Sequence, residues 1–346
     1  MTPELQRAYE ESTRPFVDGA IGTRETSMKS WRYFLEINSA CTLECPTCTK
    51  GNKEGYDHKN GIMDTDMMNR IIDKIAKENP SAIVFLYGNS EPFVHPHLAE
   101  CITAVKARGL RCEFSTNLNF VRRLGDVIAA RPDFVIISVS GFTQETYVKG
   151  HAGGNIEKVK LNMEVFGAAN EAAGSPVSLN VNYHLYKDNA HELEPMREYA
   201  KSCGMNLFVS TARAISMENA IQYCREKEGQ ESFDAGGWIL PHTTQQFRDT
   251  MDRLKIPPTQ AKEMYGQLPI QSVCPVGSGG MFTFIRHDGG TCLCPCVADR
   301  RLRLTDYLNS TPDSLIGERK DHAICQQCKT YKLNYYFHIV DRSKWD

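Results

Sequence analysis

The sequence predicts an α/β fold, either a partial (β/α)6 barrel or an open doubly wound sheet. Six short runs rich in β-branched and aromatic residues alternate with helical patterns over roughly the first 210 residues. Strands that alternate with helices are typical of a parallel sheet with right-handed crossovers. The length of 346 residues suits one large domain with a small appendage. In either fold, chemistry belongs in the loops at the carboxyl ends of the strands.

The expected strands and helices alternate along the chain. We expect strands at 32–37, 82–87, 111–115, 134–139, 177–183 and 205–210. We expect helices from Asp64 or Thr65 to residue 79 and near 97–108, 121–130, 155–173 and 191–203. Glycine readily adopts the left-handed conformation that ends many helices, so three of these helices are expected to end at Gly109, Gly174 and Gly204.

The rest of the chain divides by composition. Residues 1–30 are expected to be an N-terminal extension of a core that covers 31–214. Residues 215–270 are polar, helix-prone in pieces and interrupted by Pro257-Pro258, and we expect an irregular helical insertion, with a lid as one role for it. Residues 271–346 are expected to form a small cysteine-rich domain.

Composition excludes several classes of partner. A formal net charge of -2 gives no general attraction to nucleic acid or to anionic membranes. No apolar run approaches the ~20 residues that a membrane-spanning helix needs. The polar, acidic N-terminus lacks the apolar core of a secretory signal. We therefore expect a cytoplasmic protein without a nucleic-acid or membrane partner.

Thirteen cysteines are the most unusual feature of the composition. In a reducing compartment, clustered cysteines usually bind metal or act in redox chemistry. Scattered cysteines are expected to be buried as small apolar residues: Cys101, Cys112, Cys203 and Cys224. The others form two groups: Cys41, Cys45 and Cys48, and later Cys274, Cys292, Cys294, Cys296, Cys325 and Cys328.

The first group has Cx3Cx2C spacing and directly follows the first expected strand. One interpretation is a zinc site with His58 or His95 as its fourth ligand. The other is a [4Fe–4S] cluster held by three cysteines, which leaves one iron open to a substrate or cofactor. Spacing alone does not separate the two interpretations.

Four separated motifs, each at the end of an expected strand, resemble those of the radical S-adenosylmethionine (SAM) superfamily. They are CTLECPTC (41–48), YGNSEPFVHPHL (87–98), FSTNLN (114–119) and ISVSGFTQETYVKGHAGGNIEKV (137–159). The resemblance implies a partial (β/α)6 TIM-like barrel. It also implies that Cys41, Cys45 and Cys48 bind a [4Fe–4S] cluster whose open iron SAM chelates.

The resemblance also implies the SAM contacts. They involve Gly88, Ser90, Glu91, Ser115, Asn117, Ser140 and Asn182. Gly88 would allow close backbone approach, and Glu91 would accept from the SAM ammonium. Ser115 and Asn117 would contact the ribose or the carboxylate, and the backbone around Asn180 and Asn182 the adenine.

Three residues depart from the superfamily pattern. Thr47 stands where an aromatic residue is often found, Ser90 where a second glycine is usual, and Ser140 where aspartate is frequent. These departures concern the details of SAM packing, while the cysteine triplet itself matches the pattern.

The C-terminal cysteines resemble the auxiliary-cluster modules called SPASM and twitch domains. A hairpin of 281–287 and 291–296 is expected around Asp288-Gly289-Gly290, with strand alternation placing Cys292, Cys294 and Cys296 on one face. The resemblance implies a second [4Fe–4S] cluster on Cys274, Cys325, Cys328 and, from the Gly289-x4-Cys spacing, Cys294. Cys292 and Cys296 are alternatives to Cys294, and a zinc ribbon is the alternative to the cluster. Because no cysteine follows Cys328, one auxiliary cluster is expected.

As a function, the resemblance implies reductive cleavage of SAM and hydrogen abstraction from a small polar substrate such as a sugar, cyclitol or nucleoside. The result is oxidation, or epimerisation if a free thiol, Cys296 or Cys292, returns a hydrogen atom. A flavodoxin- or ferredoxin-type protein would be the reductant. The substrate cavity is expected to include some of His184, Tyr186, Arg213, His242, Arg286 and His287.

Two alternative functions stay open. One is a peptide-modifying enzyme, although only about 30 residues precede the first expected strand, too few for a leader-binding domain. The other is a binding protein that carries zinc or a cluster and has no enzymatic activity.

Overall fold

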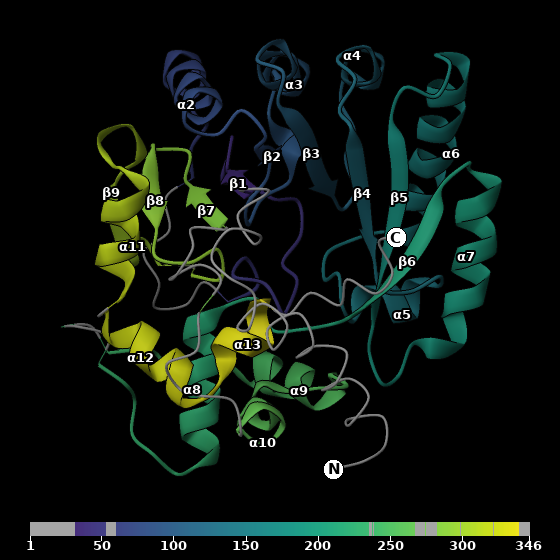
Figure 1. The fold of residues 1–346 in the computed structure, drawn as a ribbon. Helices are drawn as coiled ribbons and strands as arrows, with labels where there is room; N and C mark the ends of the chain where they lie inside the picture. The colour runs from purple at the N-terminus through teal and green to yellow at the C-terminus, as the bar shows by residue number, and fades with distance from the viewer. Residues whose placement is uncertain are drawn as a thin grey trace.

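A computed structural model describes residues 32–52, 60–234, 237, 239–266, 274, 282–297, 299–320 and 322–338. Strands and helices alternate through its first part, and the strands form one largely parallel sheet (Figure 1). The predicted α/β class and partial barrel are confirmed. The predicted extension over 1–30 lies outside the described residues.

The sheet follows the chain order from one edge to the middle. Its strand order is β6-β5-β4-β3-β2-β1-β7-β8-β9. Neighbouring strands from β1 to β6 are parallel, as the alternation predicts. The strands are β1 (Arg32–Leu35), β2 (Ile83–Phe85), β3 (Arg111–Thr116), β4 (Phe134–Val139), β5 (Ser178–Leu185), β6 (Asn206–Thr211), β7 (Phe282–Ile285), β8 (Gly290–Cys292) and β9 (Arg303–Asp306).

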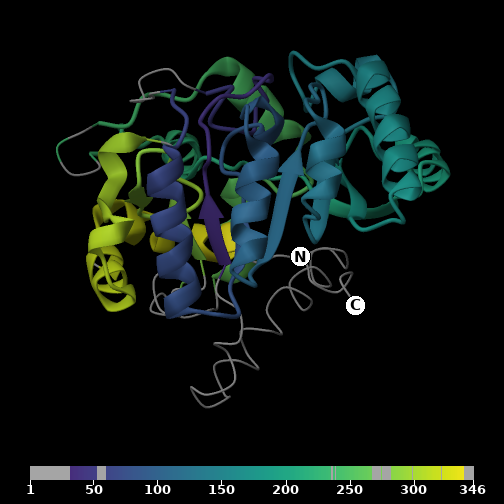
Figure 2. The same cartoon turned by 90° about the horizontal axis from the view of Figure 1, so that it is seen from above.

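Helices cover the outer face of this sheet. In order they are α2 (Thr65–Glu78), α3 (Leu98–Ala107), α4 (Leu124–Ala129), α5 (Gln144–Val148), α6 (Ile156–Ala172) and α7 (Leu193–Ser202). Short 3-10 turns are η1 (Pro92–Val94) and η2 (Ala190–Glu192). Seen from above, the blue and teal helices stand in a row on one side of the strands (Figure 2). Gly109, Gly174 and Gly204 have φ of 72°, 81° and 71° just beyond helix ends, as predicted.

The main core lies between the sheet and these helices. Helix α2 begins at Asp64, whose side chain accepts from the Met67 backbone N–H, and its Ile71, Ile72 and Ile75 are fully buried. Burying each such side chain stabilises the fold by about 1.5–3 kcal/mol. The four cysteines expected to be buried, Cys101, Cys112, Cys203 and Cys224, are buried.

A second core joins the middle and the C-terminal parts of the chain. Its helices are α8 (Met217–Lys227), α9 (Gln245–Arg253), α10 (Ala261–Tyr265), α12 (Ala323–Thr330) and α13 (Leu333–His338). Helix α11 (Pro312–Lys320) and the turns η3 (Pro258–Gln260), η4 (Arg300–Leu302) and η5 (Tyr307–Asn309) complete the fold. Figure 1 shows α8, α9, α10, α12 and α13 grouped together below the sheet. Among the described residues, no helix combines the length and apolarity needed to cross a membrane.

The C-terminal strands extend the sheet at β1. Strand β7 pairs with β1 in parallel, with Phe34 opposite Phe284 and Leu35 opposite Ile285. Residues that follow β7 therefore lie at the same edge as residues that follow β1. This pairing brings the turn after β7, where His287 lies 3.7 Å from Glu36, to the edge that carries the triplet.

The predicted hairpin forms only in part. Strands β7 and β8 are antiparallel neighbours, and the turn includes Gly289 with φ of 79°. Strand β8 ends at Cys292, and a turn closed by Val297 N–H and Cys294 C=O follows. The expected placement of Cys292, Cys294 and Cys296 on one strand face is therefore wrong, because Pro295 has no N–H for a strand ladder.

The buried carboxylate of Glu192, just before helix α7, forms hydrogen bonds with the loop after β4. Glu192 is 7% exposed and accepts from the Phe142 N–H (2.6 Å) and the Thr143 N–H (3.0 Å). It also accepts from the hydroxyls of Thr143 (2.5 Å) and Thr146 (2.8 Å). Burial raises the pKa of Glu192, but these hydrogen bonds outweigh burial and lower it below its ordinary value.

We expect Glu192→Gln to lower the free energy of unfolding by about 1–3 kcal/mol, because an amide nitrogen cannot accept the bonds of two donors. Urea denaturation under anaerobic conditions measures the change. Glu194→Gln is the matched control, since this exposed residue on α7 forms a surface pair with Arg197 at 3.2 Å. Equal effects of the two substitutions would contradict the assigned role of Glu192.

Candidate functional site

The cysteine triplet lies in a tight loop after β1. The Cys48 N–H donates to the Cys45 carbonyl at 3.0 Å, and the buried Asn52 side chain donates to the carbonyls of Pro46 and Cys48. A Cβ on Gly51 would stand 2.3 Å from the Cys45 carbonyl oxygen, so only glycine allows the loop to close this way. Backbone and side-chain bonds thus fix the loop that presents the three thiols.

Glu91 joins three strand-end loops at the triplet. It is 1% exposed, and its carboxylate accepts from the Asn117 N–H (2.8 Å), the Thr116 hydroxyl (2.8 Å) and the Phe93 N–H (3.1 Å). Its own N–H donates to the Ala40 carbonyl at 2.9 Å. Burial raises the pKa of Glu91 to about 7, although these bonds oppose the rise. Loops after β1, β2 and β3 therefore meet at one carboxylate.

Asn117 continues this connection to the first cysteine. Its side-chain N–H donates toward the Cys41 sulfur at 3.7 Å and to the Thr42 hydroxyl at 3.3 Å. The Leu43 N–H also points to the Cys41 sulfur, at 3.5 Å. The structure thus brings Cys41, Glu91 and Asn117, predicted from three separate motifs, into one chain of contacts.

Burial governs the acidity of the triplet thiols. The pKa of Cys41 is raised to about 11, chiefly by burial and also by the charges of Glu91 and Cys48, although the Leu43 N–H and the Lys50 charge oppose the rise. The pKa of Cys45 also lies well above its ordinary value because of burial and the charges of Cys48 and Cys41. Cys41 and Cys45 without a metal are therefore protonated at neutral pH, and a metal that binds them would replace their protons, as cysteine ligands require.

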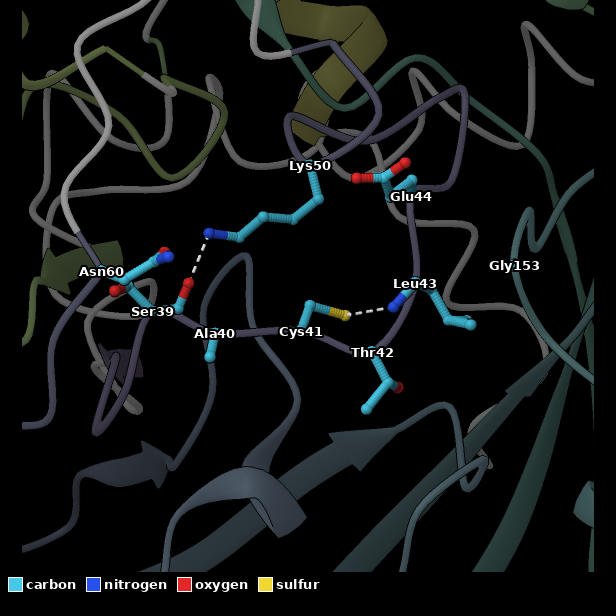
Figure 3. A pocket seen from close by; sticks show the side chains of 9 residues that line it. All are labelled: Ser39, Ala40, Cys41, Thr42, Leu43, Glu44, Lys50, Asn60 and Gly153. Atoms are coloured by element: carbon cyan, nitrogen blue, oxygen red, sulfur yellow. Dashed lines mark hydrogen bonds between the residues drawn. The ribbon is translucent and has the colours of Figure 1, made fainter.

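A cavity of about 380 Å³ opens beside the triplet (Figure 3). Its lining consists of Ser39, Ala40, Cys41, Thr42, Leu43, Glu44, Lys50, Asn60 and Gly153. Most of these residues belong to the triplet loop, and Asn60 and Gly153 contribute from other segments. A small ligand in this cavity would contact Cys41 directly.

Thr47, the residue that departs from the superfamily pattern, contacts a distant aromatic side chain. Its side chain is hydrogen-bonded to Tyr186, which follows β5 and is 1% exposed. The Thr47 carbonyl accepts from the Ile215 N–H at 2.8 Å. Tyr186 thus places an aromatic ring next to position 47.

The residues predicted to contact SAM have different surroundings. Ser90 has a buried hydroxyl without a hydrogen-bond partner in the described part of the chain, as expected of an atom that awaits a ligand. A Cβ on Gly88 would lie 2.4 Å from the Phe284 ring and 3.1 Å from the Glu36 side chain. Packing against β7 therefore already requires glycine at position 88, whether or not SAM binds there.

Three other predicted SAM contacts are engaged with protein groups. The Ser115 and Ser138 hydroxyls lie 3.2 Å apart on the neighbouring strands β3 and β4. The Asn182 oxygen accepts from Ser210 at 2.7 Å. The buried Ser140 hydroxyl contacts His151 Nδ1 at 2.7 Å. Ser115 and Asn182 are half-buried, so they remain accessible from one side. These SAM contacts stay predictions.

Buried histidines accompany Asn182 and Ser140. Burial lowers the pKa of His151 to about 3 and that of His184 to about 4, so both rings are neutral at neutral pH. The His184 Nε2 atom lies 3.1 Å from the Asn182 amide nitrogen. His184 and Tyr186 thus adjoin residues of the predicted site.

The other predicted cavity residues are dispersed. His242 is exposed and pairs with Glu226 at 3.1 Å, and Arg213 donates to the Tyr336 carbonyl at 3.0 Å. His287 lies 3.7 Å from buried Glu36 at the ends of β7 and β1, and Arg286 turns to Cys292. These residues do not surround one cavity together.

The C-terminal thiols are near one another. Burial, together with the charges of Cys294 and Cys274, raises the pKa of Cys325 to about 12. Burial and the charges of Cys274, Cys325 and Cys294 likewise hold the pKa of Cys328 well above its ordinary value. The guanidinium of Arg319, which is 3% exposed, is in electrostatic contact with Cys294, Cys274 and Cys325, and also with Cys292.

Cys292 has a different partner. The buried Arg286 Nε–H donates to its sulfur at 2.7 Å. Burial raises the pKa of Cys292 to about 11 although the Arg286 charge opposes the rise. Cys296 is half-buried, and its carbonyl accepts a hydrogen bond from the Met217 N–H. Its own N–H points to the Cys294 sulfur at 3.5 Å. Of the three alternatives, Cys294 is the thiol that neighbours Cys274, Cys325 and Cys328.

The zinc interpretations stay predictions. His95 Nδ1 accepts from the His97 N–H and neighbours Cys101, while His58 lies outside the described residues. Ligands of a tetrahedral zinc ion with bonds of about 2.3 Å lie roughly 4 Å apart. Within the described ranges, no three or more histidine, cysteine, aspartate or glutamate side chains are arranged to hold a metal ion.

Several residues of the site are absent from the sequence-based prediction. Lys50, Glu36 and Arg319 lie outside the four motifs and meet the site through folding, whereas His151 lies inside the 137–159 motif. The signals visible in the sequence are therefore a lysine two residues after the last triplet cysteine and the place of His151 in that motif.

Sequence comparisons find relatives over much of the chain. The tungsten-containing aldehyde ferredoxin oxidoreductase cofactor-modifying protein of Pyrococcus furiosus is 25% identical over 267 residues, which cover 75% of this chain and 70% of that protein. A probable GTP 3′,8-cyclase of Methanococcus maripaludis is 28% identical over 177 residues, 49% of this chain and 55% of its own length. No family model matches the sequence.

Structural comparisons find the same fold at low identity. Streptococcus suis SuiB bound to the precursor peptide SuiA has a TM-score of 0.54 and 12% identity over 94% of this chain and 75% of SuiB. Native anSMEcpe with bound AdoMet has a TM-score of 0.52 and 12% identity over 89% of this chain and 95% of its own. Together with the sequence relatives, these structures confirm the resemblance that the four motifs predicted.

Proposed function

We propose that this chain, whose resemblance to the radical SAM superfamily is confirmed, cleaves SAM reductively and abstracts hydrogen from a small polar substrate. One observation carries the proposal: Cys41, Glu91 and Asn117, from three separate motifs, meet beside a cavity of about 380 Å³. SuiB and anSMEcpe, which share the fold, were both solved with SAM bound.

The residues around the triplet fit a [4Fe–4S] cluster. Cys41, Cys45 and Cys48 would hold it, and the cavity beside Cys41 leaves room for a further ligand. Such a cluster, once reduced, supplies the electron that cleaves SAM to a 5′-deoxyadenosyl radical. Ser90 offers an unsatisfied hydroxyl to SAM. The protein's part is to hold, orient and shield the reacting groups.

A second cluster would be held by Cys274, Cys294, Cys325 and Cys328. Their mutual electrostatic contacts and the nearby Arg319 guanidinium support this set. The pairing of Cys292 with Arg286 argues against Cys292 as a ligand. Arginine beside the thiolates would offset part of their negative charge. Cys296 stays the candidate hydrogen-atom donor, because it is half-buried and outside this set.

The substrate class rests on the sequence relatives. Both are described by small-molecule chemistry, a cofactor-modifying protein and a GTP cyclase, and the cyclase alignment covers little more than half of that enzyme. Oxidation or epimerisation of a sugar, cyclitol or nucleoside is therefore proposed first. SuiB, which binds a precursor peptide, supports peptide modification as the second candidate. A flavodoxin- or ferredoxin-type protein is proposed as the reductant.

Replacing Cys45 with alanine tests the SAM chemistry. We expect iron content to fall from about eight to about four atoms per chain and 5′-deoxyadenosine formation to stop, because the triplet loses a ligand. Anaerobic iron analysis and chromatography of the SAM products measure both. The scattered, buried Cys101→Ala is the control. Continued SAM cleavage by Cys45→Ala would refute the proposal.

The second ligand set is tested by a matched pair of substitutions. Cys294→Ala is expected to remove about four irons per chain, whereas Cys292→Ala should retain them. Electron paramagnetic resonance of the reduced proteins distinguishes the two clusters. The signal of the cluster bound by Cys41, Cys45 and Cys48 should persist in both variants, which verifies that each is folded. Iron loss in Cys292→Ala alone would assign the fourth ligand to Cys292 instead.

The substrate class is tested by isotope transfer. With deuterium on the carbinol carbons of candidate polyols and nucleosides, we expect deuterium in 5′-deoxyadenosine, because hydrogen abstraction moves it there. Mass spectrometry detects the label. Transfer from a labelled peptide but from none of the small molecules would favour the second candidate.

A further inference from the structure

A buried carboxylate, that of Glu36, lies on the inner face of the sheet. Glu36 follows β1 directly, is 6% exposed, and continues the pairing with β7 through its N–H, which donates to the Ile285 carbonyl at 2.8 Å. Its neighbours Leu35 and Ile37 belong to the main core beneath the helices, so strand alternation turns Glu36 to the opposite face. Glu36 thus lies at the carboxyl end of its strand, where barrel enzymes bind their ligands.

Glu36 differs from the other buried carboxylates of the site in its hydrogen bonds. Glu91 accepts from three donors, and Glu192 accepts four hydrogen bonds. In the part of the chain that the structure describes, no group donates a hydrogen bond to the Glu36 side chain. A carboxylate buried without donors is costly, so its oxygens need a partner that the protein does not supply.

The ring of His287, at the end of β7, faces this carboxylate. Its Nδ1 atom lies 3.7 Å from Glu36 Oε2, too far for a hydrogen bond, and is buried without a partner among the described residues. A Cβ on Gly61 would lie 2.3 Å from the ring, so glycine at position 61 leaves the space that His287 occupies. The His287 and Glu36 side chains stay 11% and 7% exposed, so the pair is not sealed from a ligand.

The distance between the two atoms fits a hydroxyl group that contacts both. An oxygen about 2.8 Å from each atom would complete two hydrogen bonds across the gap of 3.7 Å. A hydroxyl both donates and accepts, so it can donate to Glu36 and accept from the His287 Nδ1–H. One ligand atom would then satisfy both unpartnered groups.

The charges around the pair disfavour a charged ligand group. Glu36 would repel an anion, and the buried Arg286 guanidinium, which interacts electrostatically with Glu36, would repel an ammonium. Arg286 itself donates to the Cys292 sulfur at 2.7 Å and to the Asp299 carbonyl at 3.2 Å. A neutral hydroxyl is therefore the group that suits the pair best.

We propose that Glu36 and His287 bind one hydroxyl group of the substrate, with Glu36 as the acceptor and His287 as the donor. This inference rests on the proposed function, since it assigns two residues to the small polar substrate. Gly88, a predicted SAM contact, adjoins Glu36, because a Cβ on Gly88 would lie 3.1 Å from Glu36 Oε1. The pair would thus hold the hydroxyl next to the predicted SAM site.

Equilibrium binding to the cluster-loaded protein with SAM present tests the pair. The probes are ribose, myo-inositol and guanosine, one from each proposed class of substrate. For a probe that binds, we expect Glu36→Gln to raise the dissociation constant about 10- to 100-fold, because a charge-assisted hydrogen bond is lost. His287→Phe should raise it less, since this change removes one donor and keeps a ring. Neither substitution should change the affinity for SAM.

Monodeoxy analogues of the bound probe separate a direct contact from a structural effect. The analogue that lacks the recognised hydroxyl should bind the unaltered protein about 10- to 100-fold more weakly than the parent probe. Glu36→Gln should not weaken this analogue further, because the contact is already absent. Equal weakening of the parent probe and of every analogue would overturn the proposed contact.

Controls separate the possible failures. Glu194→Gln, which alters a surface pair with Arg197, should leave all affinities unchanged. Iron content and urea denaturation verify that each variant retains its clusters and its fold. If the unaltered protein binds none of the three probes, the proposed substrate class fails and the role of the pair fails with it. If a probe binds, an unchanged dissociation constant in Glu36→Gln, or weaker SAM binding in that variant, overturns the role of the pair alone.

Discussion

The site depends on the hydrogen bonds of Glu91. A carboxylate that is 1% exposed is costly to bury unless its oxygens are satisfied, and here three donors satisfy them. The donors belong to the loops after β2 and β3, and the Glu91 N–H donates to the Ala40 carbonyl in the loop after β1. Because the buried carboxylate is stable only when these bonds form, it holds the three loops in fixed relative positions. The triplet loop is therefore positioned by a constraint that lies outside the triplet.

The sequence predicted the parts of the structure that follow local rules. Strand β4 has the expected bounds, and the other five parallel strands shift by a few residues at their ends. Apolar periodicity and glycine after helix ends are local signals, and they located α2, α3, α6 and α7. The motifs marked Cys41, Glu91 and Asn117 because each lies in the loop that follows a strand.

Other features depend on contacts between distant segments and could not be predicted from the sequence. Nothing local indicates that Tyr186 meets Thr47, or that Arg286 pairs with Cys292 and so separates it from Cys294. The strand prediction beyond Cys292 failed because Pro295 introduces a turn, which outweighs the alternating pattern.

The parallel pairing of β7 with β1 bears on how the protein folds. Strand β1 has β2 on one side early in the chain, but its other edge is completed by Phe284 and its neighbours, near the opposite end of the chain. Contacts of such sequence separation form slowly because a long loop must close first. During synthesis, the edge beside the triplet thus stays unpaired until most of the chain has been made, and the triplet loop reaches its final enclosure late.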